Sequence, residues 1–246
     1  MFIGQKLIHI PELESTNQFA MDLVRNSPPP EGCTVYSDFQ TAGRGQQGNQ
    51  WLSERGANIN ASVILYPKSL TAADQFLLNM AVACAVCEAA SALCGQKCAL
   101  KWPNDVYAQG LKIAGILIEN SWAGSRWQAA IVGIGLNVNQ EDFTGFSATS
   151  LRNICGSLQS QQACFEVLFQ KLEARYLMLL GPRKEQILHD YNQLLMYRNE
   201  SIKLQFQDGN TGLGTLLGVT RSGGILVKDA LGETQEWHHP QARLVL

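Results

Sequence analysis

The sequence predicts an α+β protein in which a larger domain of strands and helices precedes a small β-barrel. Strand-like and helical runs alternate through residues 1–199. Residues 201–246 instead hold five short strand-like runs separated by glycine-containing turns. We therefore predict two domains, residues 1–199 and residues 200–246. The second domain has too few strand pairings to be stable alone, so we expect it to dock on the first.

Each element follows from a local residue pattern. Alternating or continuous apolar runs predict strands at 8–10, 33–39, 59–66, 100–108, 111–119 and 129–139, and in the second domain at 202–206, 213–220, 225–228, 234–237 and 243–246. Apolar residues at helical spacing predict helices at 18–25, 74–93, 155–180 and 183–197.

Composition narrows the class of function. The 246 residues carry a net charge of −2, which gives no broad basic surface for nucleic acid. The N-terminus does not resemble a signal peptide, and we find no apolar run long enough to cross a membrane. We therefore expect a cytoplasmic enzyme or binding protein that associates with neither nucleic acid nor membrane.

Seven cysteines raise the question of a metal centre. Cys84 and Cys87 share one face of the helical run 74–93 with Cys94, and Cys98 follows shortly after. A zinc site needs a turn that brings four ligands together, which a continuous helix does not supply. We predict reduced core thiols and assign no residue as a metal ligand.

Residues 15–17, Ser-Thr-Asn, precede the first predicted helix. Ser15 or Thr16 is suited to cap that helix, because a hydroxyl oxygen can accept from its free N–H groups. The same hydroxyls, with the Asn17 amide, would equally bind the polar head group of a ligand. The sequence leaves both interpretations open.

A glycine-rich loop follows the strand predicted at 33–39. It places Gly43, Gly45 and Gly48 around Arg44, a forked cation suited to phosphate or carboxylate oxygens. The spacing imitates a dinucleotide-binding motif, but that motif must open a helix, and here another strand-like run follows. A ligand loop and an ordinary glycine-rich surface turn remain the alternatives.

The run from 100 to 119 predicts a hairpin that turns at Gln109-Gly110. A two-residue turn places Lys112 opposite Tyr107, with Asp105 diagonal to Lys112 on the same face. A lysine and an aspartate on one sheet face suggest a shared ligand. An ordinary exposed hairpin is the alternative.

Alternation in the strand at 129–139 separates two faces. Val132, Ile134 and Leu136 point into a core, whereas Gly133, Gly135, Asn137 and Asn139 point the other way. Glycine is disfavoured inside strands unless something approaches closely. A bound ligand and a packed element both meet that need.

Together these stretches resemble the biotin–protein ligases. The matching motifs, in the family's order, are Ser15-Thr16-Asn17, Gln40 with Gly43-Arg44-Gly45-x-x-Gly48-x-x-Trp51, Lys101-Trp-Pro-Asn-Asp105, Lys112-x-Ala-Gly115-Ile, Gly133-Ile-Gly-Leu-Asn137-Val-Asn139 and Thr149-Ser-Leu151. The resemblance implies a mixed sheet flanked by helices and an SH3-like C-terminal barrel. It also implies a short form of the family, because residues 1–14 leave no room for the DNA-binding domain that many members carry.

The resemblance implies a two-step reaction. Biotin carboxylate attacks the α-phosphate of ATP, giving biotinyl-AMP and pyrophosphate. A lysine of an acceptor, the biotin carboxyl carrier protein of a biotin-dependent carboxylase, then attacks the mixed anhydride. Lys112 and Arg44 would neutralise charge on the α-phosphate, and Asp105 would orient or deprotonate the lysine amine. Mg²⁺ is expected on nucleotide oxygens rather than in a protein cage.

The resemblance also assigns ligand contacts. The implied biotin-binding residues are Ser15, Thr16, Asn17, Gln40, Gly43, Arg44, Gly45, Gln46, Lys112 and Gly115. The implied ATP and adenylate contacts are Arg44, Trp51, Asn104, Lys112 and Asn137. Gln46 and Asn49 stand where the family usually has cations.

Other interpretations remain beside this one. Lipoate or octanoate ligases share the fold and the chemistry, and a non-catalytic biotin sensor would not need Lys112 or Asp105. No serine-hydrolase elbow or zinc-protease motif occurs, and we expect His238 and His239 on the surface of the tail. An exposed strand edge would permit a homodimer.

Overall fold

The computed structural model describes residues 1–245, apart from the side chain of Gln47. Within those residues the large sheet has seven strands, in the spatial order β1-β2-β3-β7-β6-β5-β4. The strands are β1 (Leu7–Leu13), β2 (Thr34–Gln40), β3 (Ile59–Leu65), β4 (Ala99–Lys101), β5 (Asp105–Ala108), β6 (Leu111–Ala123) and β7 (Arg126–Leu136). β1 and β2 are parallel and the other neighbours are antiparallel. The predicted mixed sheet is confirmed.

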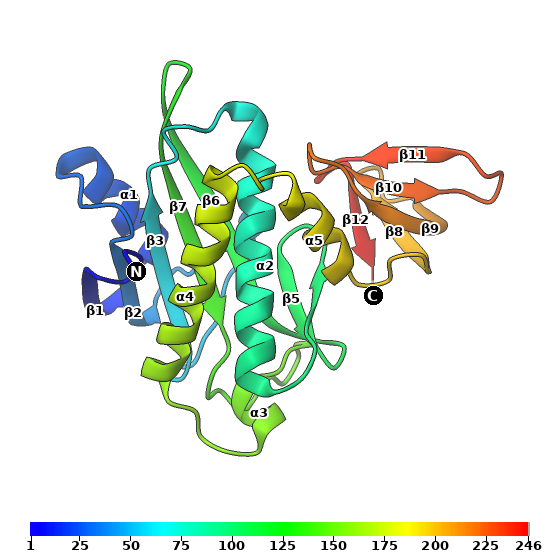
Figure 1. Ribbon diagram of the computed structural model, residues 1–246. Helices are drawn as coiled ribbons and strands as arrows, with labels where there is room; N and C mark the ends of the chain where they lie inside the picture. The colour runs from blue at the N-terminus through cyan, green and yellow to red at the C-terminus, as the bar shows by residue number, and fades with distance from the viewer. Residues whose placement is uncertain (246) are drawn as a thin grey trace.

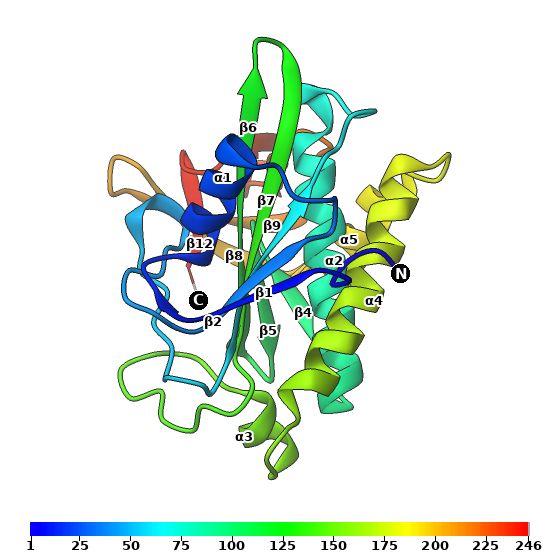
Figure 2. The same cartoon turned by 90° about the vertical axis from the view of Figure 1, so that its left-hand side faces the viewer.

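Helices cover both faces of this sheet. α2 (Gln75–Cys94), α4 (Gln161–Leu180) and α5 (Gln186–Leu194) lie on one face, as Figure 1 shows. α1 (Thr16–Asn26) lies on the other face, seen edge-on in Figure 2. Its residues Ala20 and Val24 pack on Val35, Ile64 and Ile131. The remaining short elements are η1 (Gln46–Gly48), η2 (Ala72–Asp74) and α3 (Leu151–Cys155).

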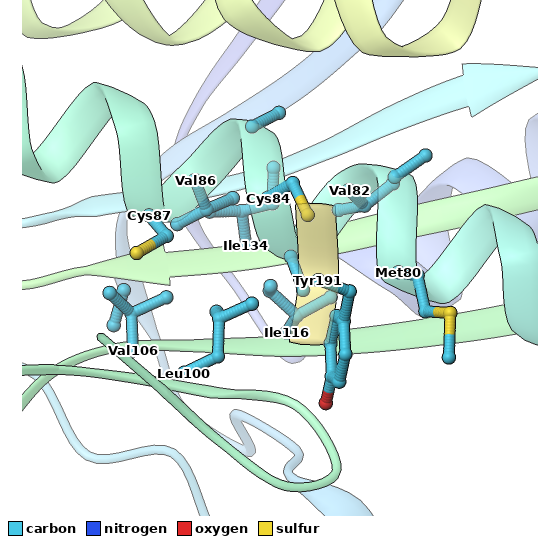
Figure 3. Close-up of a cluster of buried hydrophobic side chains, with 14 of the residues drawn as sticks. Met80, Val82, Cys84, Val86, Cys87, Leu100, Val106, Ile116, Ile134 and Tyr191 are labelled. Atoms are coloured by element: carbon cyan, nitrogen blue, oxygen red, sulfur yellow. The ribbon is translucent and has the colours of Figure 1, made fainter. Parts of the chain in front are cut away.

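The centre of the main core is α2, which is apolar around its whole circumference. Figure 3 shows Cys84 and Cys87 of this helix among aliphatic side chains of the sheet and Tyr191. Both thiols are fully buried, and burial raises the pKa of Cys84 to about 12, so it stays protonated. The prediction that these cysteines are packed core residues is confirmed.

One statement from the sequence needs correction. The segment Ala72–Cys94 is long and apolar enough to cross a membrane, with a mean hydropathy of 1.8 in its most apolar window. That window is 67% buried inside the fold, where α2 packs against the sheet and against α4, which lies beside it on the same face. Its apolar character is therefore explained by core packing.

The second sheet contains β8 (Ser201–Phe206), β9 (Thr211–Val219), β10 (Ile225–Lys228), β11 (Thr234–Trp237) and β12 (Ala242–Val245). In the described residues its order is β11-β10-β9-β8-β12, all antiparallel. The predicted small C-terminal β-fold is confirmed, although the expected end of its last strand at Leu246 lies outside the described residues. The domain boundary at 199/200 stays a prediction.

Polar contacts attach the second sheet to the first domain. Trp102 Nε1 donates to the carbonyl oxygen of Gly223, at 2.9 Å. Arg221 Nη2 lies 2.5 Å from Asp74 Oδ1, and Asp74 is 4% exposed. Burial of Asp74 opposes its ionisation, but hydrogen bonds from Thr71 and Arg221 outweigh it and lower the pKa of this carboxyl.

Candidate active site

A cavity of about 210 Å³ opens on the α1 side of the large sheet. Its walls come from the start of α1, the glycine-rich loop, the β4–β5 turn, β6, β7 and the last loop of the second sheet. It brings together most of the site residues predicted from the sequence: Ser15, Thr16, Asn17, Gln40, Arg44, Gly45, Gln46, Trp51, Asn104, Asp105, Lys112 and Gly115. Residues separated by up to 100 positions therefore converge on one space.

The first end of the cavity is lined with buried polar groups. Gln40 Oε1 accepts from the backbone N–H of Thr16 at 2.8 Å and from its hydroxyl at 3.1 Å. Ser15 occupies the N-cap position of α1 but makes no side-chain capping bond. The carboxamide of Gln40 thus caps this helix, and the Ser15 hydroxyl is not used for capping.

Asn17 is held in place from three sides. Its Oδ1 lies 2.6 Å from Ser62 Oγ, and its Nδ2 donates to the Leu117 carbonyl at 3.1 Å and to Glu119 Oε2 at 2.7 Å. Ser62 and Glu119 were not among the site residues predicted from the sequence. Ser62 repeats the face of Asn60 in an otherwise apolar strand, and Glu119 repeats the face of Gly115, so strand alternation contained both signals.

The glycine face of β7 is confirmed, and side chains from other segments cover it. A Cβ at Gly133 would overlap the Asn17 carboxamide, and one at Gly135 would overlap the Trp51 indole. Trp51 Nε1 also donates to Asn60 Oδ1 at 2.9 Å, which fixes the ring against the strand. Of the two alternatives left open by the sequence, close packing of side chains explains these glycines.

The predicted turn and the Tyr107–Lys112 pair are confirmed, and a bulge between Val106 and Tyr107 then shifts the register so that Asp105 pairs with Gly115. Gln109 and Gly110 both have positive φ, 53° and 78°, as a two-residue turn requires, and Lys112 pairs with Tyr107. Lys112 Nζ lies 2.7 Å from Asp105 Oδ1, and both side chains are about three-quarters buried, at 30% and 23% exposed. An ordinary exposed hairpin does not place an ion pair inside a cavity.

Arg44 lies at the rim rather than in the interior. Its guanidinium donates to Glu119 Oε2 at 3.2 Å, and its side chain is 42% exposed. The loop around it is closed by the backbone bond from Trp51 N–H to the Gly43 carbonyl, at 2.9 Å. Gly43 lies outside the main cavity and lines a second, more open one beside it.

Two predicted asparagines act mainly on the chain itself. Asn104 lines the cavity, but its Nδ2 donates to the Ile116 carbonyl and so joins the β4–β5 turn to β6. Asn137 is 4% exposed, does not line the cavity, and donates to the Thr149 carbonyl at 3.0 Å. The nucleotide contact of Asn137 stays a prediction, and in this structure its carboxamide bonds the loop that precedes α3.

Positive charge surrounds the cavity. Besides Arg44 and Lys112, the walls include Lys101 and Arg243, neither of which the sequence analysis assigned. Burial lowers the pKa of Lys101, the charges of Lys112 and Arg243 lower it further, and Asp105 opposes the shift. Such a site favours ligands that carry phosphate or carboxylate groups.

The expected surface position is wrong for His239. His238 is exposed, whereas His239 is half-buried, lines the cavity and stacks edge-on against Trp102 with ring centroids 5.7 Å apart. The error has a physical cause: the loop after β11 reaches the cavity only because the second sheet docks, and no local pattern reports that contact.

Comparison with known proteins agrees with this site. The model of the biotin/lipoate A/B protein ligase family matches residues 10–137. The Bifunctional ligase/repressor BirA of Bacillus spizizenii is 33% identical over 237 residues, which cover 95% of this chain and 68% of that protein. The Biotin--[acetyl-CoA-carboxylase] ligase of Paracoccus denitrificans is 39% identical over 130 residues, 51% of each chain.

Solved structures give the same result. The biotin protein ligase from Aquifex aeolicus, solved in complex with biotin and ATP, is 27% identical to this chain with a TM-score of 0.83. The match covers 98% of this chain and 99% of that one, so both sheets have counterparts. The chain therefore belongs to the biotin/lipoate A/B protein ligase family, and within it to the biotin protein ligases.

Proposed function

We propose that this chain activates biotin with ATP and transfers it to a lysine of a biotin carboxyl carrier protein. The observation that carries the proposal is the single cavity in which buried neutral donors and acceptors, around Thr16 and Asn17, adjoin the Lys112–Asp105 ion pair. A neutral ureido head group suits the part of the cavity around Thr16 and Asn17. The carboxylate and phosphate of an acyl-adenylate suit the part around Lys112.

In the first step a biotin carboxylate oxygen attacks the α-phosphorus, and the bond to pyrophosphate breaks. Negative charge on the α-phosphate oxygens rises as this occurs. Lys112 and Arg44 stabilise that charge, and Lys112 also orients the biotin carboxylate. The Lys112 ammonium is already directed into the cavity by Asp105, so little reorganisation accompanies the reaction.

The remaining predicted residues bind and orient the substrates. Ser15, Thr16, Asn17 and Gln40 hydrogen-bond the biotin head, and Gln46 contacts biotin from the glycine-rich loop. Gly43, Gly45 and Gly115 allow the backbone to approach the ligand closely. Trp51 packs beside the adenylate. Asn104 holds the β4–β5 turn against β6, and Asn137 holds the loop whose backbone bonds Lys112.

Magnesium fits this site as part of the nucleotide substrate. Among the described residues no group of three His, Cys, Asp or Glu side chains is close enough to hold a metal ion, and Asp105 and Glu119 already have cationic partners. We propose that Mg²⁺ enters on ATP phosphate oxygens and adds charge neutralisation there.

The wider assignments are part of the same proposal. The acceptor is the carrier protein of a biotin-dependent carboxylase, and the reaction takes place in the cytoplasm. The net charge of −2 favours a role without nucleic acid. β1 forms one edge of the large sheet, and its exposed backbone suits edge-to-edge pairing in a homodimer.

The test separates this function from its rivals. The chain is incubated with ATP, Mg²⁺ and biotin, lipoate or octanoate in turn, and acyl-AMP is measured by mass spectrometry with pyrophosphate release. Of the three acids, only biotin should give an acyl-AMP. Lipoyl-AMP or octanoyl-AMP would indicate the related ligases, and biotin binding without any adenylate would indicate a sensor.

A further inference from the structure

His239 lies where two cavities meet. It lines the main cavity together with Asp105 and Lys112, and it also lines the second, more open cavity of about 700 Å³. The second cavity is bounded by the glycine-rich loop, Glu119 and Pro240. An acceptor lysine that approaches an adenylate in the main cavity through this opening passes the imidazole of His239.

The imidazole is held by a rigid support. It stacks edge-on against Trp102, which is 2% exposed and is itself anchored by its bond to the Gly223 carbonyl. Its neighbour His238 is exposed and pairs instead with Glu236, at 3.1 Å. Of these two adjacent histidines, one is directed to the cavity and the other away from it.

Burial keeps the imidazole of His239 neutral among several charged groups. Lys101, Lys112, Arg243 and Asp105 line the main cavity, and Arg44 and Glu119 line the second. Burial lowers the pKa of His239 from its usual value of 6.5, against a smaller opposing effect of Asp105. At pH 7 the ring is therefore mainly uncharged and able to accept a proton.

A group that accepts a proton would accelerate the transfer step. A free lysine has a pKa of about 10.4, so the acceptor amine arrives as an ammonium and must lose a proton before it attacks. Asp105 is bound to Lys112 and Glu119 to Asn17 and Arg44, so both carboxylates are engaged by groups of the chain itself. His239 is an imidazole that lines both cavities.

We propose that His239 is the general base of the transfer step, an inference that rests on the proposed function. The imidazole takes one proton from the acceptor ammonium and later passes it to solvent. The freed electron pair forms a C–N bond with the acyl carbon of biotinyl-AMP. The C–O bond to the phosphate breaks with its electron pair going to AMP, and the second proton leaves the nitrogen to the departing phosphate or to solvent.

The test uses His239→Gln, with His238→Gln as the matched control. Transfer is followed in a single turnover from purified biotinyl-AMP to the apo carrier protein, and adenylate formation is followed separately by pyrophosphate release. Loss of a general base typically costs about 10²–10⁴ in rate. We expect His239→Gln to slow transfer about 10²-fold at pH 7 and adenylate formation far less, while His238→Gln matches the wild type in both.

The pH profile distinguishes a base from a structural support. With a neutral His239 the wild-type transfer rate falls as pH drops through a value below 6.5 and levels off above it. His239→Gln should instead rise about tenfold per pH unit towards the pKa of lysine, since only the free amine reacts.

Several outcomes would overturn the inference. Equal losses in both half-reactions, or a variant profile parallel to the wild type, would make His239 a support for the docked sheet. Transfer at the wild-type rate would remove it from the mechanism. If wild-type protein forms no biotinyl-AMP, the proposed function itself fails, which this design separates from the other results.

Discussion

Lys112 Nζ and Asp105 Oδ1 are 2.7 Å apart across a bulged hairpin, inside a cavity that also contains Lys101 and Arg243. A bulge in this hairpin pairs Asp105 with Gly115. The side chains of Asp105 and Lys112 both line the cavity. The carboxylate therefore fixes the direction of the lysine before any substrate binds. This relationship connects the register of two strands to the chemistry of the site.

Lys112→Ala should nearly abolish adenylate formation without unfolding the chain. Removing one preorganised donor to a developing anion typically costs about 10²–10³ in rate. Pyrophosphate release in a single turnover measures the effect, and Lys203→Ala, on the exposed face of β8, is the matched control. Adenylate formation by Lys112→Ala at the wild-type rate would remove Lys112 from the mechanism.

Asp105→Asn should slow both half-reactions by similar factors, roughly tenfold or more, because the substitution releases Lys112 from its fixed position. The two steps are timed separately with purified biotinyl-AMP. A loss confined to transfer would instead identify Asp105 as the base for the acceptor amine, the other role implied by the sequence, and would count against His239.

Gly135→Ala should destabilise the fold through one contact. The added methyl group overlaps the Trp51 indole, and overpacking of this kind typically costs about 1–3 kcal/mol. Urea unfolding measures the free energy of unfolding. In a Trp51→Ala background the same substitution should cost under about 1 kcal/mol, and an unchanged cost there would show that the strain lies elsewhere.

Gln46→Arg should slow the release of biotinyl-AMP. Gln46 lines both cavities at the tip of the glycine-rich loop, and a charged hydrogen bond to phosphate adds about 1.5–3 kcal/mol. We expect retention to rise about ten- to a hundredfold. Trapped adenylate is timed as it escapes, with Gln235→Arg on β11 as control. Equal or faster escape would mean that the loop retains adenylate without charge.

Arg221→Gln should weaken docking of the second sheet by roughly 1–3 kcal/mol, because buried Asp74 loses a charged donor. Folding lowers the pKa of Asp74 below its usual value of 3.8. The stabilisation from ionised Asp74 is therefore fully present above the unfolded pKa and is lost as pH falls through the lower, folded pKa. The free energy of unfolding, measured by urea unfolding, should therefore be lower for the variant than for the wild type at pH 7. The two values should converge at acid pH. An equal difference at both pH values would contradict this linkage.

Local patterns predicted the elements whose geometry depends on near neighbours. The two-residue turn at Gln109-Gly110 predicted the pairing of Lys112 with Tyr107, although not the bulge that follows it, and alternation in β7 separated Gly135 from Ile134. The same rules did not show that Trp51 would occupy the glycine face. That contact joins two segments across the sheet, and only the folded topology specifies it.

The positions of His239 and Arg243 also depend on contacts between segments that are distant in the sequence. His239 and Arg243 reach the cavity because Trp102 and Asp74 anchor the second sheet beside it. His239 lies in the short loop between β11 and β12, and Arg243 lies within β12; neither segment contains a local signal of that position. Family motifs identified most of the residues that line the cavity, and docking of the second sheet added residues that no motif included.

The most direct test of the account is the complete reaction. The chain is incubated with ATP, Mg²⁺, biotin and an apo carrier protein, and intact-mass and peptide analysis of the carrier follow. We predict one biotinyl amide on one lysine of the carrier, formed by the wild type and by His238→Gln but not by Lys112→Ala. Unmodified carrier, or a carrier that receives lipoate or octanoate in place of biotin, would contradict the assignment.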